Sequence, residues 1–433
     1  MNNTELYKSR VMTAEEALSK IRSGDHIAVH HSTAEPYALM RELYKRTDLY
    51  GLIVTCGGTG MGEFAKPEYE SIIRHNCVFA NPSPFVNKAV AESRADFVPI
   101  YLSNLARYFS EYYPPDVTLL QVPPPDDNGY TSLSLGVDYT KAAVESTKRL
   151  VIAQVNPRMP YVSNEDALVH ISKIHCFVEM ETELIVIPPY TTPTEQEQDL
   201  CKNVASLVAD GSCLQIGLGR LPDTVLSYLG DRNDLGIHSE VFSDGTVDLV
   251  RKGVITGKRK NIDTGKIVAT FAAGTKKTFE FIDHNEMVLI RSLNYVNDPF
   301  VIAQNDNMVS INGCLQVDLL GQVASDALGD RQIAGVGGQV DFVRGAGRSK
   351  GGKSILVVPS TALNGTVSSI ASVLAEGSVV TTNRYDVHYI VTEYGIADLR
   401  FKNRADRARQ LIAIAHPKFR DELLEKAKLR KII

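Results

Sequence analysis

The sequence lacks several features that would assign a chain to a class at once. Its six cysteines are scattered, and no two of them are separated by only two residues. That spacing argues against a structural zinc site or a disulfide framework and favours the reducing cytoplasm. No apolar run approaches the roughly 18 residues that span a bilayer. The first ten residues are polar, so we expect neither a membrane span nor a signal peptide.

An excess of basic charge is also missing. The 46 Lys and Arg against 51 Asp and Glu give a formal net charge of −5, which leaves no basic surface for nucleic acid. The histidine groupings, His30 with His31 and His170 with His175, lack the spacing of metal ligands, and we expect no metal site. With 44% hydrophobic and 22% charged residues the composition is that of a globular protein. At 433 residues the chain is too long for one ordinary core, which predicts two domains.

Strand and helix patterns alternate along the chain. Thr13 and Glu16 form a capping-box pattern that begins a helix ending by Gly24. The next segments are expected as strand 26–30, helix 37–44, strand 52–55, strand 117–122, helix 137–148 and strand 150–155. This alternation is typical of βαβ units. We therefore predict the α/β class, with two open domains, largely parallel sheets and an active site in the cleft between the domains.

A proline-rich stretch, residues 185–194, marks the expected domain boundary. Proline cannot continue a strand ladder, and linkers favour such composition. The boundary divides the chain into an N-terminal α/β domain, residues 1–190, and a C-terminal α/β domain, residues 191–433. The pattern restarts as helix 195–209, strand 213–216, helix 222–229, strands 267–271, 309–317 and 354–358, and helices 403–415 and 418–428.

A glycine loop separates the expected strand 213–216 from the helix that follows it. The loop consists of Gly217, Leu218, Gly219, Arg220 and Leu221. Glycines let the backbone approach a ligand closely, and the N–H groups at a helix start attract anions. A dinucleotide-binding fingerprint would need a small residue where Pro222 stands, although Glu240 lies at the distance of its acidic residue. The alternatives to an anion-binding loop are a nicotinamide-binding loop, which Pro222 disfavours, and a plain strand-to-helix turn.

A second glycine cluster contains Gly335, Gly337 and Gly338 within four positions. An ordinary turn rarely needs three glycines so close together. The cluster indicates a bare backbone against a ligand, with N–H groups free to hold an oxyanion. A β-bulge or a tight corner is the structural alternative.

Glu240 is the candidate catalytic residue. It lies between Ile237-His238-Ser239 and Val241-Phe242, which places it near the end of a buried strand rather than on a helix face. A buried carboxylate is costly, and such a cost is often accepted for function. A carboxylate beside loops that bind phosphate or an oxyanion is typical of a nucleophile rather than a proton shuttle.

These motifs resemble the acetyl-CoA hydrolase/transferase family of CoA-transferases, and most of all its 4-hydroxybutyrate and butyrate CoA-transferases. The resemblance rests on the segments 236–245, 217–221 and 335–342, and extends to 295–298, 303–307, 391–395, 94–97, 127–130 and 159–161. It therefore covers essentially the whole chain. Succinate-using relatives have an asparagine where this chain has Ala334, so a dicarboxylate preference is not carried over.

The resemblance implies a ping-pong reaction. Glu240 would attack an acyl-CoA, such as 4-hydroxybutyryl-CoA or butyryl-CoA, and pass through a glutamyl-CoA thioester before CoA is transferred to acetate. Coenzyme A would be a substrate, with no permanently bound cofactor. The loop Gly217 to Leu221 and the pair Gly337 and Gly338 would contact CoA or form the oxyanion site. A cytoplasmic homodimer or homotetramer is expected on the same ground.

Other functions stay open at this point. The family also contains acetyl-CoA hydrolases, and leakage of water to the Glu240 intermediate would give that activity. Another short acid, such as itaconate, could replace butyrate, because one methylene or hydroxyl in a pocket is worth only about 1–3 kcal/mol. A non-catalytic CoA or nucleotide sensor on the same fold is the alternative from another class. The intact Glu240 and both glycine loops argue against the sensor.

Overall fold

The computed structural model describes residues 2–56, 62–77, 84–188 and 190–433. Tertiary contacts divide the chain into two compact units. The first contains Met1–Pro189, Val241–Asp244 and Val268–Val296, and the second contains Tyr190–Glu240, Gly245–Ile267 and Asn297–Ile433. The chain thus leaves the first unit after Pro189, which itself lies outside the described residues, and returns to it for two short segments.

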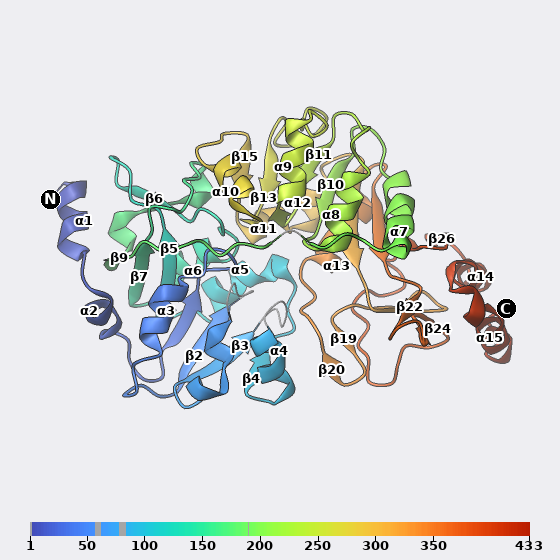
Figure 1. Cartoon of the computed structure of the whole chain (residues 1–433), viewed down its shortest axis with the longest axis horizontal. Helices are drawn as coiled ribbons and strands as arrows, with labels where there is room; N and C mark the ends of the chain where they lie inside the picture. The colour runs from blue at the N-terminus through green and yellow to red at the C-terminus, as the bar shows by residue number, and fades with distance from the viewer. Residues whose placement is uncertain (1, 57–61, 78–83, 189) are drawn as a thin grey trace. The chain divides into compact units, whose positions relative to one another are not determined.

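A seven-stranded sheet forms the centre of the first unit (Figure 1). Its order is β4 (Ala95–Phe97), β3 (Ile73–Cys77), β2 (Leu52–Cys56), β1 (His26–Val29), β5 (Val117–Val122), β7 (Leu150–Val155) and β9 (Cys176–Glu179). Every neighbouring pair is parallel. All six side chains of β5 and of β7 are buried, as expected for central strands of a parallel sheet covered on both faces.

Helices α2 (Ala14–Leu18) and α3 (Tyr37–Leu43) supply apolar side chains to the core of this unit. The predicted capping box is confirmed: Thr13 accepts a hydrogen bond from the backbone N–H of Glu16, and the Glu16 carboxylate accepts one from the N–H of Thr13. The helix ends at Leu18, earlier than expected, and the chain then turns toward β1.

The second unit contains six successive strands of a sheet. They follow the order β11 (Gly236–His238), β10 (Cys213–Ile216), β16 (Met308–Gly313), β21 (Lys353–Val357), β25 (Tyr389–Thr392) and β26 (Gly395–Asp398). The strands pair in parallel from β11 to β25, and β26 adds an antiparallel edge through a tight hairpin. The α/β class with largely parallel sheets is therefore confirmed.

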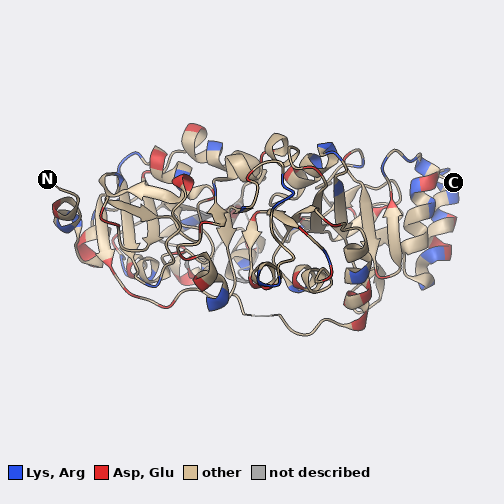
Figure 2. Cartoon of the chain, turned by 90° about the horizontal axis from the view of Figure 1, so that it is seen from above, with Lys and Arg blue, Asp and Glu red and all other residues tan. Residues whose placement is uncertain are grey.

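Helices from several parts of the second unit accompany its sheet. They are α7 (Glu195–Ser206), α8 (Arg220–Ser227), α13 (Gln339–Arg348), α14 (Arg404–Ile414) and α15 (Pro417–Leu429). Figure 2 shows acidic and basic residues interspersed along the helices next to the C-terminus, where Arg409 pairs with Asp406 on α14 and Lys426 pairs with Glu422 on α15. Leu411 and Leu423 on the other side of these helices are buried with Ile390 of β25. Such solvated ion pairs add little stability, so apolar burial holds the two helices in place.

Two of the expected strands are interrupted. Residues 267–271 form β13 (Ile267–Ala269) and β14 (Phe271–Ala272), and residues 309–317 form β16 and β17 (Gln316–Asp318). A local sequence pattern does not reveal such a break, because the break depends on which strand each piece pairs with: β14 and β17 pair in sheets other than those of β13 and β16. No helix in the described part of the chain combines the length and the apolar character that crossing a membrane requires.

Candidate active site

The candidate nucleophile follows the strand next to the glycine loop. β10 and β11 are parallel neighbours, with Leu214 opposite Ile237, so the segments after both strands emerge at the same edge of the sheet. Ser239, which is fully buried, joins the two strand ends. Its Oγ donates to the carbonyl oxygen of Ile216 at 2.9 Å and accepts from the N–H of the same residue at 3.2 Å. Glu240 comes next in the chain, and Gly217 follows Ile216.

The side chain of Glu240 lies against an amide and a bare glycine. Asn297 Nδ2 donates a hydrogen bond to Glu240 Oε1 at 3.1 Å. A Cβ added to Gly338 would lie 2.5 Å from the same oxygen and 2.7 Å from Glu240 Cδ, closer than non-bonded atoms approach. The second glycine cluster therefore leaves space for the carboxylate, and Gly338 is the position where this space is needed.

Gly338 is also the N-cap of α13, and Gly337 before it adopts a φ of +58°. A left-handed residue before the cap favours glycine. The first N–H groups of a helix have no partners within the helix, and the helix start carries partial positive charge. Glu240 thus lies beside the start of α13, where the helix dipole favours negative charge. The β-bulge alternative for this cluster is wrong, whereas the tight-corner alternative fits, because Gly337 and Gly338 form a turn that leads into the ten-residue helix α13.

The first glycine loop begins α8. Gly219 is its N-cap, with a φ of +139° that favours glycine, and Pro222 lies in the first turn as expected. Arg220 starts the helix two residues earlier than predicted, and its guanidinium is held on the surface by Glu197, with Nε 3.0 Å from Oε1. The Arg220 side chain is therefore engaged in an ion pair with Glu197, and the backbone is the part of this loop that we consider for ligand binding.

The segment after Glu240 has a structural function. The Asp244 carboxylate accepts hydrogen bonds from Thr278 Oγ1 at 2.5 Å and from Thr275 Oγ1 at 2.7 Å. Burial opposes ionisation of Asp244, but these hydrogen bonds outweigh it and hold the pKa of its carboxyl below the ordinary value. A Cβ at Gly245 would come within 2.8 Å of Leu226 Cδ1 of α8. Asp244 and Gly245 therefore fix the turn that follows Glu240.

The histidines of the first unit are held by internal partners. His31 Nδ1 lies 2.7 Å from Asp138 Oδ2, and buried His30 contacts the carbonyl oxygen of Gly136 at 2.7 Å. Burial lowers the pKa of His30 below the ordinary value. Among residues 2–56, 62–77, 84–188 and 190–433, no group of three or more His, Cys, Asp or Glu is arranged to hold a metal ion.

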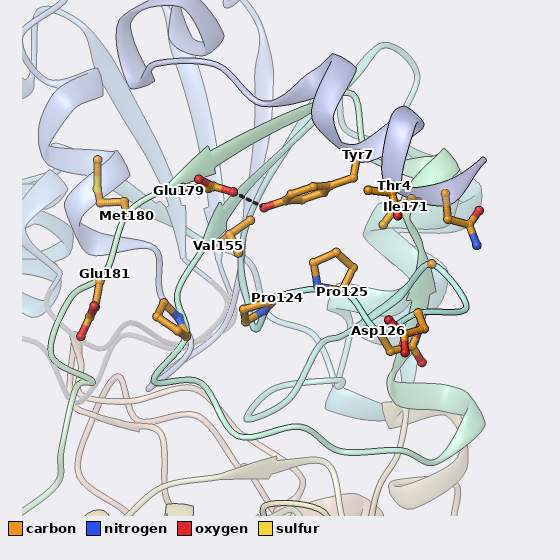
Figure 3. Close-up of a pocket in the computed structure, with 14 residues that line it drawn as sticks. Thr4, Tyr7, Pro124, Pro125, Asp126, Val155, Ile171, Glu179, Met180 and Glu181 are labelled. Carbon is orange, nitrogen blue, oxygen red and sulfur yellow. Dashed lines mark hydrogen bonds between the residues drawn. The ribbon is translucent and has the colours of Figure 1, made fainter. Parts of the chain in front are cut away.

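A cavity of about 500 Å³ lies in the first unit, between α1 (Asn3–Arg10) and the ends of β7 and β9 (Figure 3). Its described lining includes the carboxylates of Asp126, Asp127, Glu179 and Glu181 and no lysine or arginine. Tyr7 donates to Glu179 across this cavity at 2.8 Å. Four carboxylates repel an anionic ligand, so this cavity is unsuited to a phosphate-bearing molecule, and the Glu240 constellation is the better candidate site.

Two residues near Glu240 were not predicted as site residues. Asn297 is fully buried, and Asp341 in the first turn of α13 is 3% exposed. Asn297 Nδ2 lies 3.5 Å from Asp341 Oδ2 in addition to its contact with Glu240. The only sequence signal was their membership of two segments, 295–298 and 335–342, that carry the family resemblance.

Comparison with known proteins identifies two family domains in the chain. Residues 1–189 match the acetyl-CoA hydrolase/transferase N-terminal domain, and residues 274–427 match the C-terminal domain of the same description. The chain is 47% identical over 429 residues to the 4-hydroxybutyrate coenzyme A transferase of Clostridium kluyveri, with 98% of this chain and 99% of that protein covered.

Further relatives differ in the acids that their names mention. The chain is 41% identical over 425 residues to the succinyl-CoA:cyclohexane-1-carboxylate CoA transferase of Geobacter metallireducens, covering 98% of this chain and 96% of that protein. Among solved structures, RipA from Yersinia pestis is similar over 100% of both chains, with a TM-score of 0.93 and 39% sequence identity.

Proposed function

The chain belongs to the acetyl-CoA hydrolase/transferase family, and from this premise we propose that it moves CoA between a short-chain acyl-CoA and acetate through a covalent intermediate on Glu240. It is an enzyme of the CoA-transferase type. The observation that carries the mechanism is the placement of the Glu240 carboxylate, which accepts from Asn297 and lies against Gly338 at the start of α13.

In the first half-reaction a Glu240 oxygen attacks the acyl carbonyl carbon. The carbon–sulfur bond breaks, CoA leaves as the thiolate, and an acyl-glutamyl anhydride forms. The thiolate sulfur then attacks Glu240 Cδ, the bond from Cδ to the acyl-bearing oxygen breaks, and the first carboxylic acid departs as its carboxylate. Glu240 is left as a thioester with CoA. A second carboxylate repeats the two steps in reverse, so no step consumes ATP.

The anhydride is steeply uphill in water, so the CoA portion of the substrate must supply binding energy to the reacting centre. Each attack also places negative charge on a carbonyl oxygen. Backbone N–H groups at Gly337 and Gly338 and in the loop Gly217 to Leu221 are the donors that we assign to CoA and to this oxyanion. They are suitable because both loops begin helices. Water must be excluded, because it would hydrolyse either intermediate.

The acyl group that we propose is 4-hydroxybutyryl or butyryl, with acetate as partner acid. The 4-hydroxybutyrate coenzyme A transferase of C. kluyveri supports the first choice, because it matches nearly the full length of the chain. Itaconate and related short acids are alternatives within the same chemistry. CoA serves as substrate and not as a resident cofactor. Cys176, Cys201, Cys213 and Cys314 form no disulfide, which suits the cytoplasm. We expect a homodimer or homotetramer.

The test is an intact-mass measurement after brief incubation with butyryl-CoA. A CoA-sized adduct that hydroxylamine removes and that peptide mapping places on Glu240 is the expected result. Glu240→Ala should form no adduct, and Glu422→Ala, which changes an exposed glutamate of α15, should form it as the wild type does. An adduct on another residue, or none with any short acyl-CoA, contradicts the mechanism. If the rate does not depend on added acetate, the enzyme is a hydrolase.

A further inference from the structure

Asp341 is a buried carboxylate for which the proposed mechanism has no use. It is the third residue of α13 after the N-cap Gly338, and only 3% of its surface is exposed. An acid in the first turn of a helix is ordinarily solvated and gains only a small stabilisation from the helix dipole. Removing its charge from water costs more than that, so the position needs another explanation.

The amide of Asn297 connects Asp341 with the nucleophile. Asn297 Nδ2 carries two hydrogens and has a carboxylate oxygen on each side: Glu240 Oε1 at 3.1 Å and Asp341 Oδ2 at 3.5 Å. The opposite orientation of the amide would place its oxygen against two carboxylates and is excluded by repulsion. One donor group therefore serves both carboxylates.

The other end of the same amide is not held. Asn297 Oδ1 is buried, and within the described residues it has no hydrogen-bond partner. A buried acceptor without a donor destabilises the fold. Only the Nδ2 end therefore fixes the rotation of the amide, and Asp341 is the partner at that end that is not altered when Glu240 becomes acylated.

We propose that Asp341 is a positioning residue that fixes the Asn297 amide so that Nδ2 faces Glu240 in every state of the reaction. The inference rests on the proposed function. Asp341 does not touch the substrate, and it acts through Asn297. Because the amide stays oriented when Glu240 is a thioester, the same N–H group can donate to the thioester carbonyl oxygen when the second acid attacks.

A double-mutant cycle tests this proposal. The four proteins are the wild type, Asp341→Asn, Asn297→Ala and the double variant, each assayed for kcat and for the KM of butyryl-CoA. Asp341→Asn keeps the shape and removes the charge, and it should lower kcat about tenfold or more with KM changed less than about twofold. In the Asn297→Ala background the same substitution should change kcat less than about twofold, because the group through which it acts is gone.

A purely structural role predicts a different pattern. Asp341→Asn would then lower kcat by the same factor in both backgrounds, or leave it unchanged in both, and either result overturns the proposal. Asp318→Asn is the matched control, because Asp318 is 1% exposed and accepts from the backbone N–H groups of Leu320 and Gln322. It should show equal factors in the two backgrounds.

Two further measurements keep the outcome clear. Thermal melts of all variants show whether Asp341→Asn is folded at the assay temperature. If it is not, the cycle is repeated with Asp341→Glu, which retains the charge but displaces it, and the same unequal factors are expected. The wild-type exchange of CoA between butyryl-CoA and acetate is measured first. Absence of that exchange contradicts the proposed function, whereas normal exchange with equal factors contradicts only the role of Asp341.

Discussion

Asn297 Nδ2 donates to Glu240 Oε1 at 3.1 Å, although 57 positions separate the two residues in the sequence. The donor is neutral, and this matters for the proposed attack of the carboxylate on a carbonyl. A lysine or arginine at the same distance would form an ion pair, whose attraction the attacking oxygen would have to give up. An amide fixes the direction of the carboxylate at a smaller energetic cost.

Replacement of Asn297 tests this relationship directly. Asn297→Ala should lower kcat by about 10²-fold, because a misplacement of the nucleophile by about 1 Å has a cost of that order. Asn297→Asp should be worse, since it places a third carboxylate beside Glu240 and Asp341. The measurement is the rate of CoA-adduct formation on Glu240 after mixing with butyryl-CoA. Equal rates for Asn297→Ala and the wild type would mean that the amide does not orient the nucleophile.

Gly338→Ala should remove activity for a steric reason. The new Cβ would lie 2.5 Å from Glu240 Oε1, so the carboxylate must move, and we expect kcat to fall by about 10²-fold or more. Unfolding free energy should fall by about 1–3 kcal/mol, as for other overpacked sites. Steady-state kinetics and urea denaturation measure the two effects.

Gly347→Ala is the control on the same helix. Gly347 is exposed in α13, and an added Cβ meets nothing within 4 Å. Since alanine is the better helix former by up to about 1 kcal/mol, this variant should be as active as the wild type and equally or more stable. Loss of activity in both variants would indicate that α13 as a whole, rather than the contact at Gly338, is sensitive.

The sequence predicted the parts of the site that depend on local backbone geometry. Gly219 and Gly338 stand at helix starts. The backbone conformation requires glycine at Gly219, and the lack of space for a Cβ requires it at Gly338. Glu240 stays the predicted nucleophile, because a charged residue at a strand end, directly before Val241 and Phe242, is conspicuous in the sequence. Adjacency in space was harder: Ser239 joins β11 to β10 only because those two strands are neighbours in the sheet, and strand order cannot be obtained from periodicity.

Asn297 and Asp341 could not be predicted from composition or spacing. Asp341 follows the glycine cluster, but an acid in the first turn of a helix is common. Asn297 precedes Asp298 and Pro299, which look like a helix cap, and Asp298 indeed caps α12 (Pro299–Ile302). Their importance arises from the fold, which brings both residues to Glu240. The interrupted strands 267–271 and 309–317 were missed for a related reason, because each break occurs where the chain passes from one sheet to another.

Glu240→Asp should retain the charge and lose most of the rate. Shortening the side chain by one methylene withdraws the carboxylate by about 1 Å from the reacting carbon, with an expected cost near 10²-fold. The contact with Asn297 Nδ2, now at 3.1 Å, would also lengthen. Glu240→Ala should lose several orders of magnitude, because no group remains to carry the CoA. A rate for Glu240→Asp close to that of the wild type would point to a proton shuttle instead of a nucleophile, because a proton shuttle tolerates small displacements.

His388 should make the protein sensitive to acid. Burial, and then the positive charge of Arg400, lower the pKa of His388 from 6.5 to about 4, although Asp398 partly opposes them. Between these two values the unfolded chain binds a proton that the folded chain does not, so stability falls as the pH falls from about 6.5 to about 4. The loss amounts to about 3 kcal/mol, because each unit of difference in pKa corresponds to about 1.36 kcal/mol.

His388→Gln cannot bind the proton, and its free energy of unfolding should therefore decrease by about 2–3 kcal/mol less than that of the wild type between pH 7 and pH 4.5. Urea denaturation at the two pH values measures the difference. The control is His284→Gln, at a histidine that is 71% exposed, and it should lose as much stability as the wild type. If His388→Gln also loses as much, the folded protein accepts the proton on His388 without cost, and its acid sensitivity comes from other groups.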